Sequence, residues 1–303
     1  MKDHQLKALV QVADCGSIRA AARAMHLSPS ALTKALRELE EDVGAELLTR
    51  SYKGVEFTPA GSALLVRARL VLTTLDKARD EVRYLRGGAG AKITAAITPT
   101  IATTALPGVL KDFERLQPDA QLTLIEGMMT SVIPALHEGS IDFAVVITDP
   151  EDLPHDMDFE PLGLVRGTVV GREGHPLADA REWSELRNAR WVLNLIHGST
   201  GHHLLDWLER SGLERPVNPV LCTSPTLMLE LTRHTDLIGF GPEPLFLDPV
   251  FSVGVQRFTE LPAAPPMSLG ILTLRGVPLS AAARPLAELF ARHIRQPTPV
   301  LSS

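Results

Sequence analysis

A short stretch near the N-terminus carries hydroxyl and cationic side chains at helical spacing. Ser28 and Pro29 open a predicted helix, because serine accepts a hydrogen bond from a free backbone N–H and proline at the first position loses none. Hydroxyl, ammonium and guanidinium groups at the start of a helix can reach base edges and phosphates in a major groove. The pattern predicts a nucleic-acid contact made by Ser28, Pro29, Ser30, Thr33, Lys34 and Arg37.

The elements around this helix favour a helix-turn-helix. Apolar spacing predicts a first helix over residues 5–13 and a second, alanine-rich helix over 18–25, with Ser17 as its N-cap. The third helix buries a stripe that runs from Ala31 to Val43. Residues 47–58 predict two short strands around a basic turn, a wing whose Arg50 and Lys53 reach flanking phosphates or the minor groove.

The alternative is an ordinary amphipathic helix with a solvated charged face, which binds nothing. The order of a short helix, a tight turn and a longer helix, followed by a wing, favours DNA binding. The charge distribution agrees with it. Residues 1–90 carry 14 Lys and Arg against 11 Asp and Glu, whereas residues 91–303 carry 16 against 25, so the basic surplus lies at the front.

These residues carry a family resemblance. The stretch from Ala8 to Gly61 resembles the winged helix-turn-helix of LysR-type transcriptional regulators. The matching residues are Gly16-Ser17, Ala21-Ala22, Leu27 to Thr33, Leu39-Glu40, Val43-Gly44, Leu47-Leu48, Arg50 and Thr58 to Gly61. Two departures are visible: Pro29 is followed by Ser-Ala-Leu-Thr, and Leu48 replaces a common Phe. Neither adds a charge to the core, but the family's base preference cannot be carried over.

The resemblance implies a multidomain fold: an all-α winged helix-turn-helix head, a long linker helix and an α/β, periplasmic-binding-protein-like sensor of two lobes. The expected domains are residues 1–58, 59–90 and 91–303, with lobe I at about 92–163 and 268–303 and lobe II at about 164–267. The implied partners are double-stranded DNA, a small-molecule effector, further copies of the chain in a homodimer or homotetramer, and RNA polymerase.

The predicted linker helix starts at Thr58-Pro59 and ends at a glycine-rich hinge, residues 87–90. Its apolar residues are spaced 4, 3, 4, 3, 4 and 3 apart, which is a heptad seam, so we expect this helix to pair with another copy. The alternative is packing on its own domain. The seam residues are Leu64, Ala68, Val71, Leu75, Ala78, Val82 and Leu85.

From Lys92 strands and helices alternate, as in an open α/β sheet. The predicted strands are residues 93–98, 121–126, 143–147, 168–171, 191–195, 219–223, 237–241 and 268–274. The predicted helices are residues 106–116, 129–137, 203–211, 226–233 and 281–295.

Ligands of such sheets bind where strands end and helices begin, because helix N-termini offer free N–H groups and a positive field. Hydroxyl-rich helix starts at residues 98–100, 129–131, 198–201 and 223–226 predict an effector cleft for a small, anionic organic molecule. The alternative is that these Ser and Thr side chains only cap helices. The candidate effector-binding residues are Thr98, Thr100, Met129, Thr130, Ser199, Thr200, Thr223 and Phe240.

Other functions find less support. His197, His202 and His203 near Ser199 could suggest a nucleophile or a metal cluster. Residues 198–201 lack the spacing of a nucleophile elbow, however, and adjacent histidines cannot readily face one metal, so we expect no enzyme, metal or cofactor. Cys15 and Cys222 fall in different domains, which argues against a disulfide switch. A periplasmic solute-binding protein would have a signal peptide and no winged head. With neither a signal peptide nor a membrane span in the sequence, we expect a cytoplasmic protein.

Overall fold

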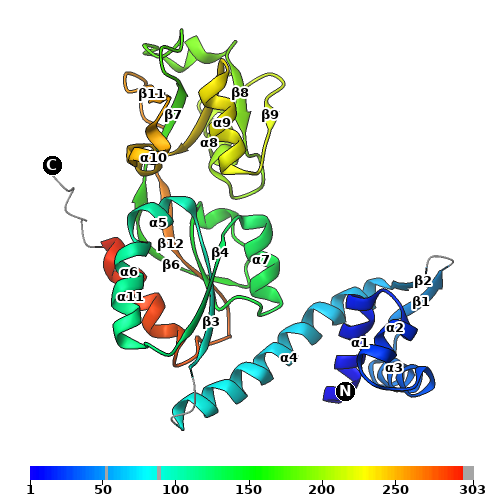
Figure 1. Cartoon of the computed structure of the whole chain (residues 1–303). Coiled ribbons are helices and arrows are strands. Elements are labelled where there is room, and N and C mark those ends of the chain that lie inside the picture. The colour runs from blue at the N-terminus through cyan, green and yellow to red at the C-terminus, as the bar shows by residue number, and fades with distance from the viewer. Residues whose placement is uncertain (52–53, 87–89, 296–303) are drawn as a thin grey trace. The chain divides into compact units, whose positions relative to one another are not determined.

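The computed structural model describes residues 1–51, 54–86 and 90–295. The chain divides into two compact units. One comprises Met1–Gly88 with Pro134–Ser140, and the other comprises Ala89–Ile133 with Ile141–Ser303. Figure 1 gives the course of the chain through both units. In the described residues no helix is long and apolar enough to cross a membrane.

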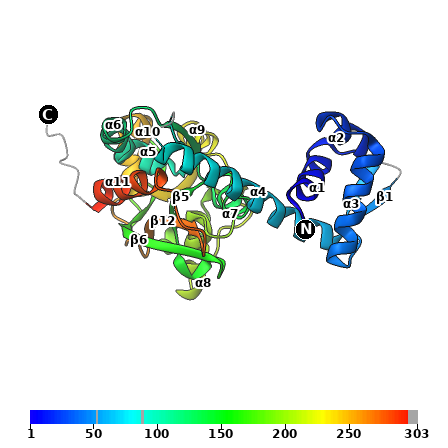
Figure 2. The same cartoon turned by 90° about the horizontal axis from the view of Figure 1, so that it is seen from below.

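The N-terminal unit begins with three helices, which Figure 2 shows from below. They are α1 (Asp3–Cys15), α2 (Ile18–Ala24) and α3 (Pro29–Val43). Gly16 ends α1 in the left-handed conformation that glycine favours, and the side chain of Ser17 caps α2 by accepting from the N–H of Ala20. The shared core includes Leu9 and Val12 of α1, both fully buried.

A hairpin and a long helix complete this unit. Strands β1 (Leu48–Ser51) and β2 (Gly54–Phe57) pair antiparallel, and α4 (Pro59–Leu85) follows at once. Thr58 caps α4 by accepting from the N–H of Gly61, and its own hydroxyl donates to the carbonyl of Glu46. The cap therefore ties the start of α4 to the loop before the hairpin.

Lobe I of the second unit is built on a five-stranded sheet of order β4-β3-β5-β12-β6. Strands β3 (Lys92–Ile97), β4 (Gln121–Glu126) and β5 (Phe143–Thr148) run parallel, and β12 (Met267–Leu274) joins antiparallel to both β5 and β6 (Met157–Val165). The helices of this part of the chain are α5 (Pro99–Thr104), α6 (Leu106–Leu116), α7 (Met129–His137) and α11 (Ala283–Arg295).

Helix α11 packs on α6 and on the sheet. The rings of Phe143 and Phe290 meet edge to face at 6.1 Å, and both side chains are fully buried. Nε2 of His293 lies 2.9 Å from the carboxylate of Asp112, and this hydrogen bond holds the pKa of Asp112 below its ordinary value. The apolar contact and the polar one together fix α11 in lobe I.

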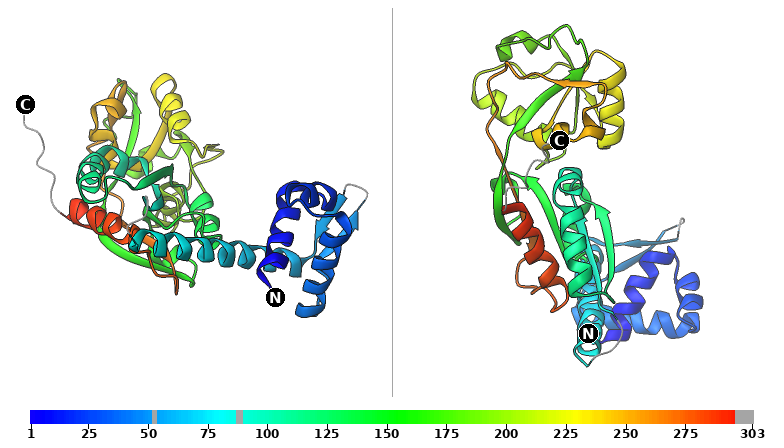
Figure 3. Two further views of the ribbon diagram at one scale, coloured as in Figure 1. Left: turned by 60° about the horizontal axis from the view of Figure 1, so that its bottom comes forward. Right: turned by 60° about the vertical axis from the view of Figure 1, so that its left-hand side comes forward.

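Lobe II is a second five-stranded sheet of order β11-β7-β10-β8-β9. Its strands are β7 (Gly167–Arg172), β8 (Arg190–Leu193), β9 (Val220–Leu221), β10 (Leu237–Pro242) and β11 (Val255–Arg257). Its helices are α8 (Thr200–Arg210), α9 (Pro225–His234) and α10 (Pro249–Ser252), with short 3₁₀ turns at η2 (Trp183–Leu186) and η3 (Glu243–Leu247). The chain passes between the lobes from β6 to β7 and again from β11 to β12 (Figure 3).

Strand β6 is the longest element that the sequence did not predict. It contains Pro161 and Gly163, which disfavour a strand interior. The structure accommodates both because β6 is an edge strand with β12 as its one neighbour, and the register shifts between Leu269 and Gly270, where Pro161 is paired. Elements α5, α10, β11 and the 3₁₀ turns were also not predicted, because three to six residues carry too little periodicity.

Gly61 marks a close approach within the N-terminal unit. A Cβ at this position would overlap the backbone carbonyl of Leu47, which cannot rotate away as a side chain can. We expect Gly61→Ala to lower the free energy of unfolding by about 1–3 kcal/mol, as overpacking does. Thermal and urea unfolding would measure this. Ser62→Ala, at the exposed neighbouring position, is the control, and equal stability of the two variants would contradict the prediction.

Candidate DNA-binding surface and effector pocket

Helix α3 presents a polar edge at its N-terminal end. Leu32, Leu36 and Leu39 are buried in the core, so the opposite side of the helix faces outward. Of the predicted DNA-contacting residues on α3 and its cap, all but one are exposed, and Thr33 is half-buried. The exposed residues are Ser28, Pro29, Ser30, Lys34 and Arg37.

Some of these side chains also have structural partners. The hydroxyl of Ser28 accepts from the N–H of Ala31 at 3.1 Å, and Thr33 donates to the carbonyl of Pro29 at 2.8 Å. Nζ of Lys34 lies 3.8 Å from Glu38, but the lysine side chain is 79% exposed. An ion pair this open contributes little, so Lys34 can exchange it for a phosphate at small cost.

The wing has the predicted hairpin backbone, with Arg50 opposite Val55 in the antiparallel register. Lys53 lies outside the described residues, as does the side chain of Arg50. Their predicted contacts with DNA therefore stay predictions.

The seam on α4 divides into two parts. Ala68 is 1% exposed and belongs to the core of the N-terminal unit, with Leu64 packed against the same core. Ala68 is therefore covered by its own chain, and the structure does not support its predicted role in dimerisation. Beyond it the seam is exposed: Val71 by 44%, Leu75 by 40%, Val82 by 58% and Leu85 by 69%, with Ala78 exposed between them. Most of the predicted glycine hinge, residues 87–89, lies outside the described residues.

A pocket opens in the second unit, lined from both lobes. The starts of α5, α7, α8 and α9 all contribute, as expected of helices that follow strand ends. Six of the eight predicted residues line it: Thr98, Thr100, Met129, Ser199, Thr200 and Phe240. Thr130 and Thr223 are exposed and are not among the lining residues, so the structure does not support a role for them there.

Several lining residues were missed from the sequence. They are mainly apolar and include Met128, Ile196, Met228, Leu229, Phe246 and Phe251. Phe246 and Phe251 lie on η3 and α10, two short elements without a sequence signal. A methionine pair at 128–129 was visible in the sequence, but only its second member was predicted to line the cleft.

Some hydroxyl groups around the pocket have hydrogen-bond partners in the protein, and one has none among the described residues. Ser199 caps α8, donating to the carbonyl of Asn194 at 2.6 Å and accepting from the N–H of His202. The hydroxyl of Thr98 makes no cap for α5; it is buried and has no hydrogen-bond partner among the described residues. A buried hydroxyl without a partner costs about 1–3 kcal/mol, so Thr98 is a favourable place for a polar ligand group.

Comparison with known proteins identifies both units. A family model described as the LysR substrate binding domain matches residues 86–295, more than half of the chain. A second, described as a bacterial regulatory helix-turn-helix protein of the lysR family, matches residues 4–62. The chain belongs to the LysR family.

Relatives and solved structures agree with this assignment. The chain is 26% identical to the transcriptional regulator TdcA of Escherichia coli K12 over 261 residues, 86% of this chain and 82% of TdcA. It is 33% identical to the regulator ClcR of Pseudomonas putida over 142 residues, 47% of this chain and 48% of ClcR. The crystal structure of CbnR, a LysR family transcriptional regulator, has a TM-score of 0.68 at 20% identity and covers 98% of this chain and 100% of CbnR.

This LysR-family protein is therefore a DNA-binding transcriptional regulator with a substrate-binding domain. The predicted family and fold class are confirmed. Full-length CbnR complexed with its target DNA has a TM-score of 0.67 at 21% identity, over 97% of this chain and 100% of that one. The fold of the present chain is thus one that has been observed on DNA.

The exposed edge of α3 makes a prediction for DNA binding. Lys34→Ala and Arg37→Ala should each weaken binding by a few kcal/mol at most and lower the slope of log affinity against log salt by about 0.9 for each phosphate that is no longer neutralised. Gel shifts over a salt series, with DNA from beside the protein's own gene, would measure both quantities. Lys111→Ala, an exposed position on α6, is the control for net charge. Unchanged affinity and slope in both α3 variants would contradict the prediction.

Proposed function

We propose that this regulator responds to a small, largely apolar effector with one polar group, bound in the pocket between lobes I and II. The observation that carries the proposal is the chemistry of the lining. Apolar side chains of Met, Leu, Ile, Val, Phe and Pro form most of the wall, and the unsatisfied hydroxyl of Thr98 offers one directed hydrogen bond. Pockets of this kind take apolar ligands and orient them by a few polar groups.

The same lining argues against the anionic effector expected from the sequence. None of the described residues that line the pocket is Lys, Arg or His, so a carboxylate would meet only hydroxyl, amide and backbone N–H groups. The helix starts around the pocket favour an anion by about 0.3–2 kcal/mol each, which is small beside the cost of burying a charge without a countercharge. An uncharged ligand fits better.

Binding also fits this pocket better than catalysis. None of the described lining residues is an Asp, Glu or His that could act as a general base, and the hydroxyl of Ser199 is engaged as a helix cap. We infer that occupancy changes how the protein presents its DNA-binding heads, and that RNA polymerase is the partner through which this affects transcription.

We further propose that the exposed seam of α4, from Val71 to Leu85, pairs with the same seam of a second copy. The supporting observation is an apolar stripe at heptad spacing that the described residues of its own unit leave exposed. Pairing would place two helix-turn-helix heads in one molecule, which suits operators with two half-sites.

Replacing the hydroxyl of Thr98 tests the effector pocket. Thr98→Val keeps the shape of the side chain and removes the unsatisfied group, so the melting temperature of the ligand-free protein should stay the same or rise. Affinity for the effector should fall by about tenfold, the value of one hydrogen bond. Thermal shift against a panel of small metabolites would find binders, and calorimetry would then compare the variants.

Thr130→Val is the matched control, since Thr130 is exposed and does not line the pocket. Binders that bind Thr98→Val as tightly as the unmodified protein would count against the pocket. Such a result would leave the DNA-binding assignment untouched.

A charge placed in the seam tests pairing. Val82→Asp should weaken self-association by tenfold or more, because an aspartate would be buried against apolar side chains. Sedimentation velocity over a concentration series would measure the association constant.

The control for this test is Arg83→Ala, which changes net charge by the same amount. Arg83 lies about 100° further around the helix, and its side chain is 65% exposed. If Val82→Asp associates as strongly as Arg83→Ala, the seam is not the interface.

A further inference from the structure

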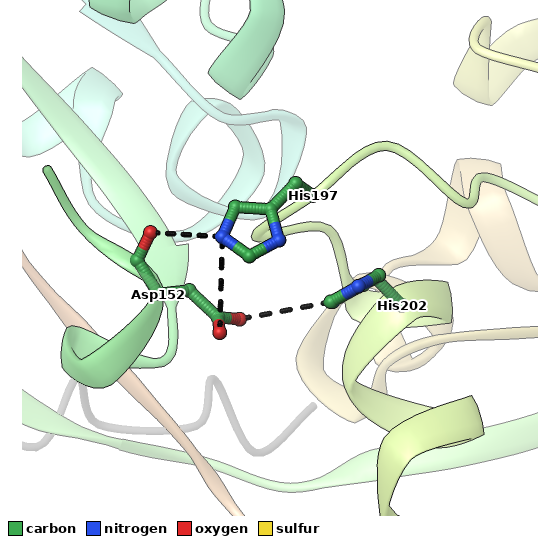
Figure 4. A group of neighbouring side chains, drawn as sticks. All are labelled: Asp152, His197 and His202. Carbon is green, nitrogen blue, oxygen red and sulfur yellow. Dashed lines mark hydrogen bonds and ion pairs between the residues drawn. The ribbon is translucent and has the colours of Figure 1, made fainter.

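Three side chains of metal-ligating type meet near the pocket, from segments far apart in the sequence. Asp152 ends the short turn η1 (Pro150–Asp152) that follows β5 of lobe I. His197 and His202 belong to lobe II, one before α8 and one in its first turn. One ligand atom from each residue lies within 4.8 Å of the other two, and Figure 4 shows the side chains facing one another.

The individual distances show which atoms converge. Nε2 of His197 lies 3.9 Å from Oδ1 of Asp152, and Nδ1 of His202 lies 3.8 Å from Oδ2 of the same carboxylate. The two imidazole rings stand edge to face at 4.8 Å. The carboxylate of Asp152, from lobe I, therefore lies between one ring nitrogen of His197 and one of His202, both from lobe II.

His202 has a buried ring nitrogen without a hydrogen-bond partner among the described residues. Its Nδ1 is buried and makes no hydrogen bond within the described residues, since both neighbouring carboxylates lie beyond hydrogen-bond distance. The second of these carboxylates is that of Asp206, at 3.6 Å. A buried ring nitrogen between two carboxylates is where a cation would be favourable.

We propose that Asp152, His197 and His202 form a binding site for one zinc-type divalent cation. Two imidazole nitrogens and a carboxylate oxygen are a common donor set for zinc, and water or Asp206 would complete four-coordination. Donors at about 2.1 Å from a tetrahedral zinc ion lie about 3.4 Å apart. Nε2 of His197 also lies 3.1 Å from the backbone carbonyl of Asp152, so zinc binding would replace that hydrogen bond and bring the donors closer than the present 3.8 and 3.9 Å.

The neighbouring His203 does not join the site. Its Nδ1 lies 3.8 Å from Asp149 and its Nε2 lies 3.4 Å from the carbonyl of Pro265. The sequence-based argument that adjacent histidines cannot share a metal therefore holds for His202 and His203. The argument missed the pair His197 and His202, which the turn before α8 brings together around a carboxylate from the other lobe.

The position of the site gives the cation a structural role. Its ligands come from both lobes, so a bound ion would join η1 of lobe I to the start of α8 in lobe II. Gly198, Ser199 and Thr200, which lie between the two histidines, line the effector pocket. The cation would therefore hold one wall of that pocket against lobe I.

Zinc titration of the full-length protein tests the site, with any histidine tag removed. Calorimetry with Zn²⁺ alone should show one ion per chain, and His197→Ala and His202→Ala should each weaken its binding at least tenfold. His155→Ala, an exposed histidine on the loop after η1, should bind zinc as the unmodified protein does. The His197 side chain is 68% exposed, so its removal should leave the fold intact.

Thermal unfolding gives a second readout. Zn²⁺ should raise the melting temperature of the unmodified protein and of His155→Ala, and should not raise that of the His197→Ala/His202→Ala double variant. Two outcomes overturn the proposal: no stoichiometric binding by the unmodified protein, or equal affinity of the double variant. Either result would leave the effector pocket and the DNA-binding surface as they stand.

Discussion

The burial of one leucine row on α3 is the constraint on which the DNA-binding head depends. Leu32, Leu36 and Leu39 are almost fully buried in the core of the N-terminal unit, where α3 packs against α1 and α2. Since a helix has only one face to bury, this packing decides which side chains remain outside. The polar edge from Ser28 to Arg37 is the face that the core does not use, and its orientation follows from the burial of its neighbours.

In the second unit, too, the packing of the backbone elements decides where the functional side chains lie. The chain crosses between the two sheets at β6–β7 and β11–β12, so the lobes share one boundary, where strands end and helices begin. Helix starts supply Thr98, Ser199 and Thr200 to this boundary, while the methionine and phenylalanine side chains fill the space around them. A pocket between the lobes, lined by both hydroxyl and apolar side chains, is therefore a consequence of the topology.

Much of this architecture could be predicted from the sequence. Capping residues such as Ser17, Ser28 and Thr58 predict where helices begin, and each of them caps a helix in the structure. Regular apolar spacing gave the long helices and most strands. The elements that were not predicted have local causes: Pro161 disfavours a strand at β6, and η3 and α10 contain too few residues to show a period.

The sites were harder to predict than the fold, for a related reason. A hydroxyl at a helix start looks the same in sequence whether it faces a pocket, as Thr98 does, or solvent, as Thr130 does. Likewise Ala68 fits the heptad seam as well as Val82 does, and only tertiary packing distinguishes them. Asp152 and His202 are fifty residues apart, and their spacing in the sequence does not indicate that the fold brings them close together.

The close contact of Gly61 with Leu47 has a mechanical consequence. The backbone of Gly61 lies against the carbonyl of Leu47, Thr58 hydrogen-bonds to Glu46 and Gly61, and α1 packs against α4. Residues of α1, α2, α3 and the first half of α4 therefore share one core. Because of this shared core, a rotation of α4 would be expected to turn the three helices of the head together with it.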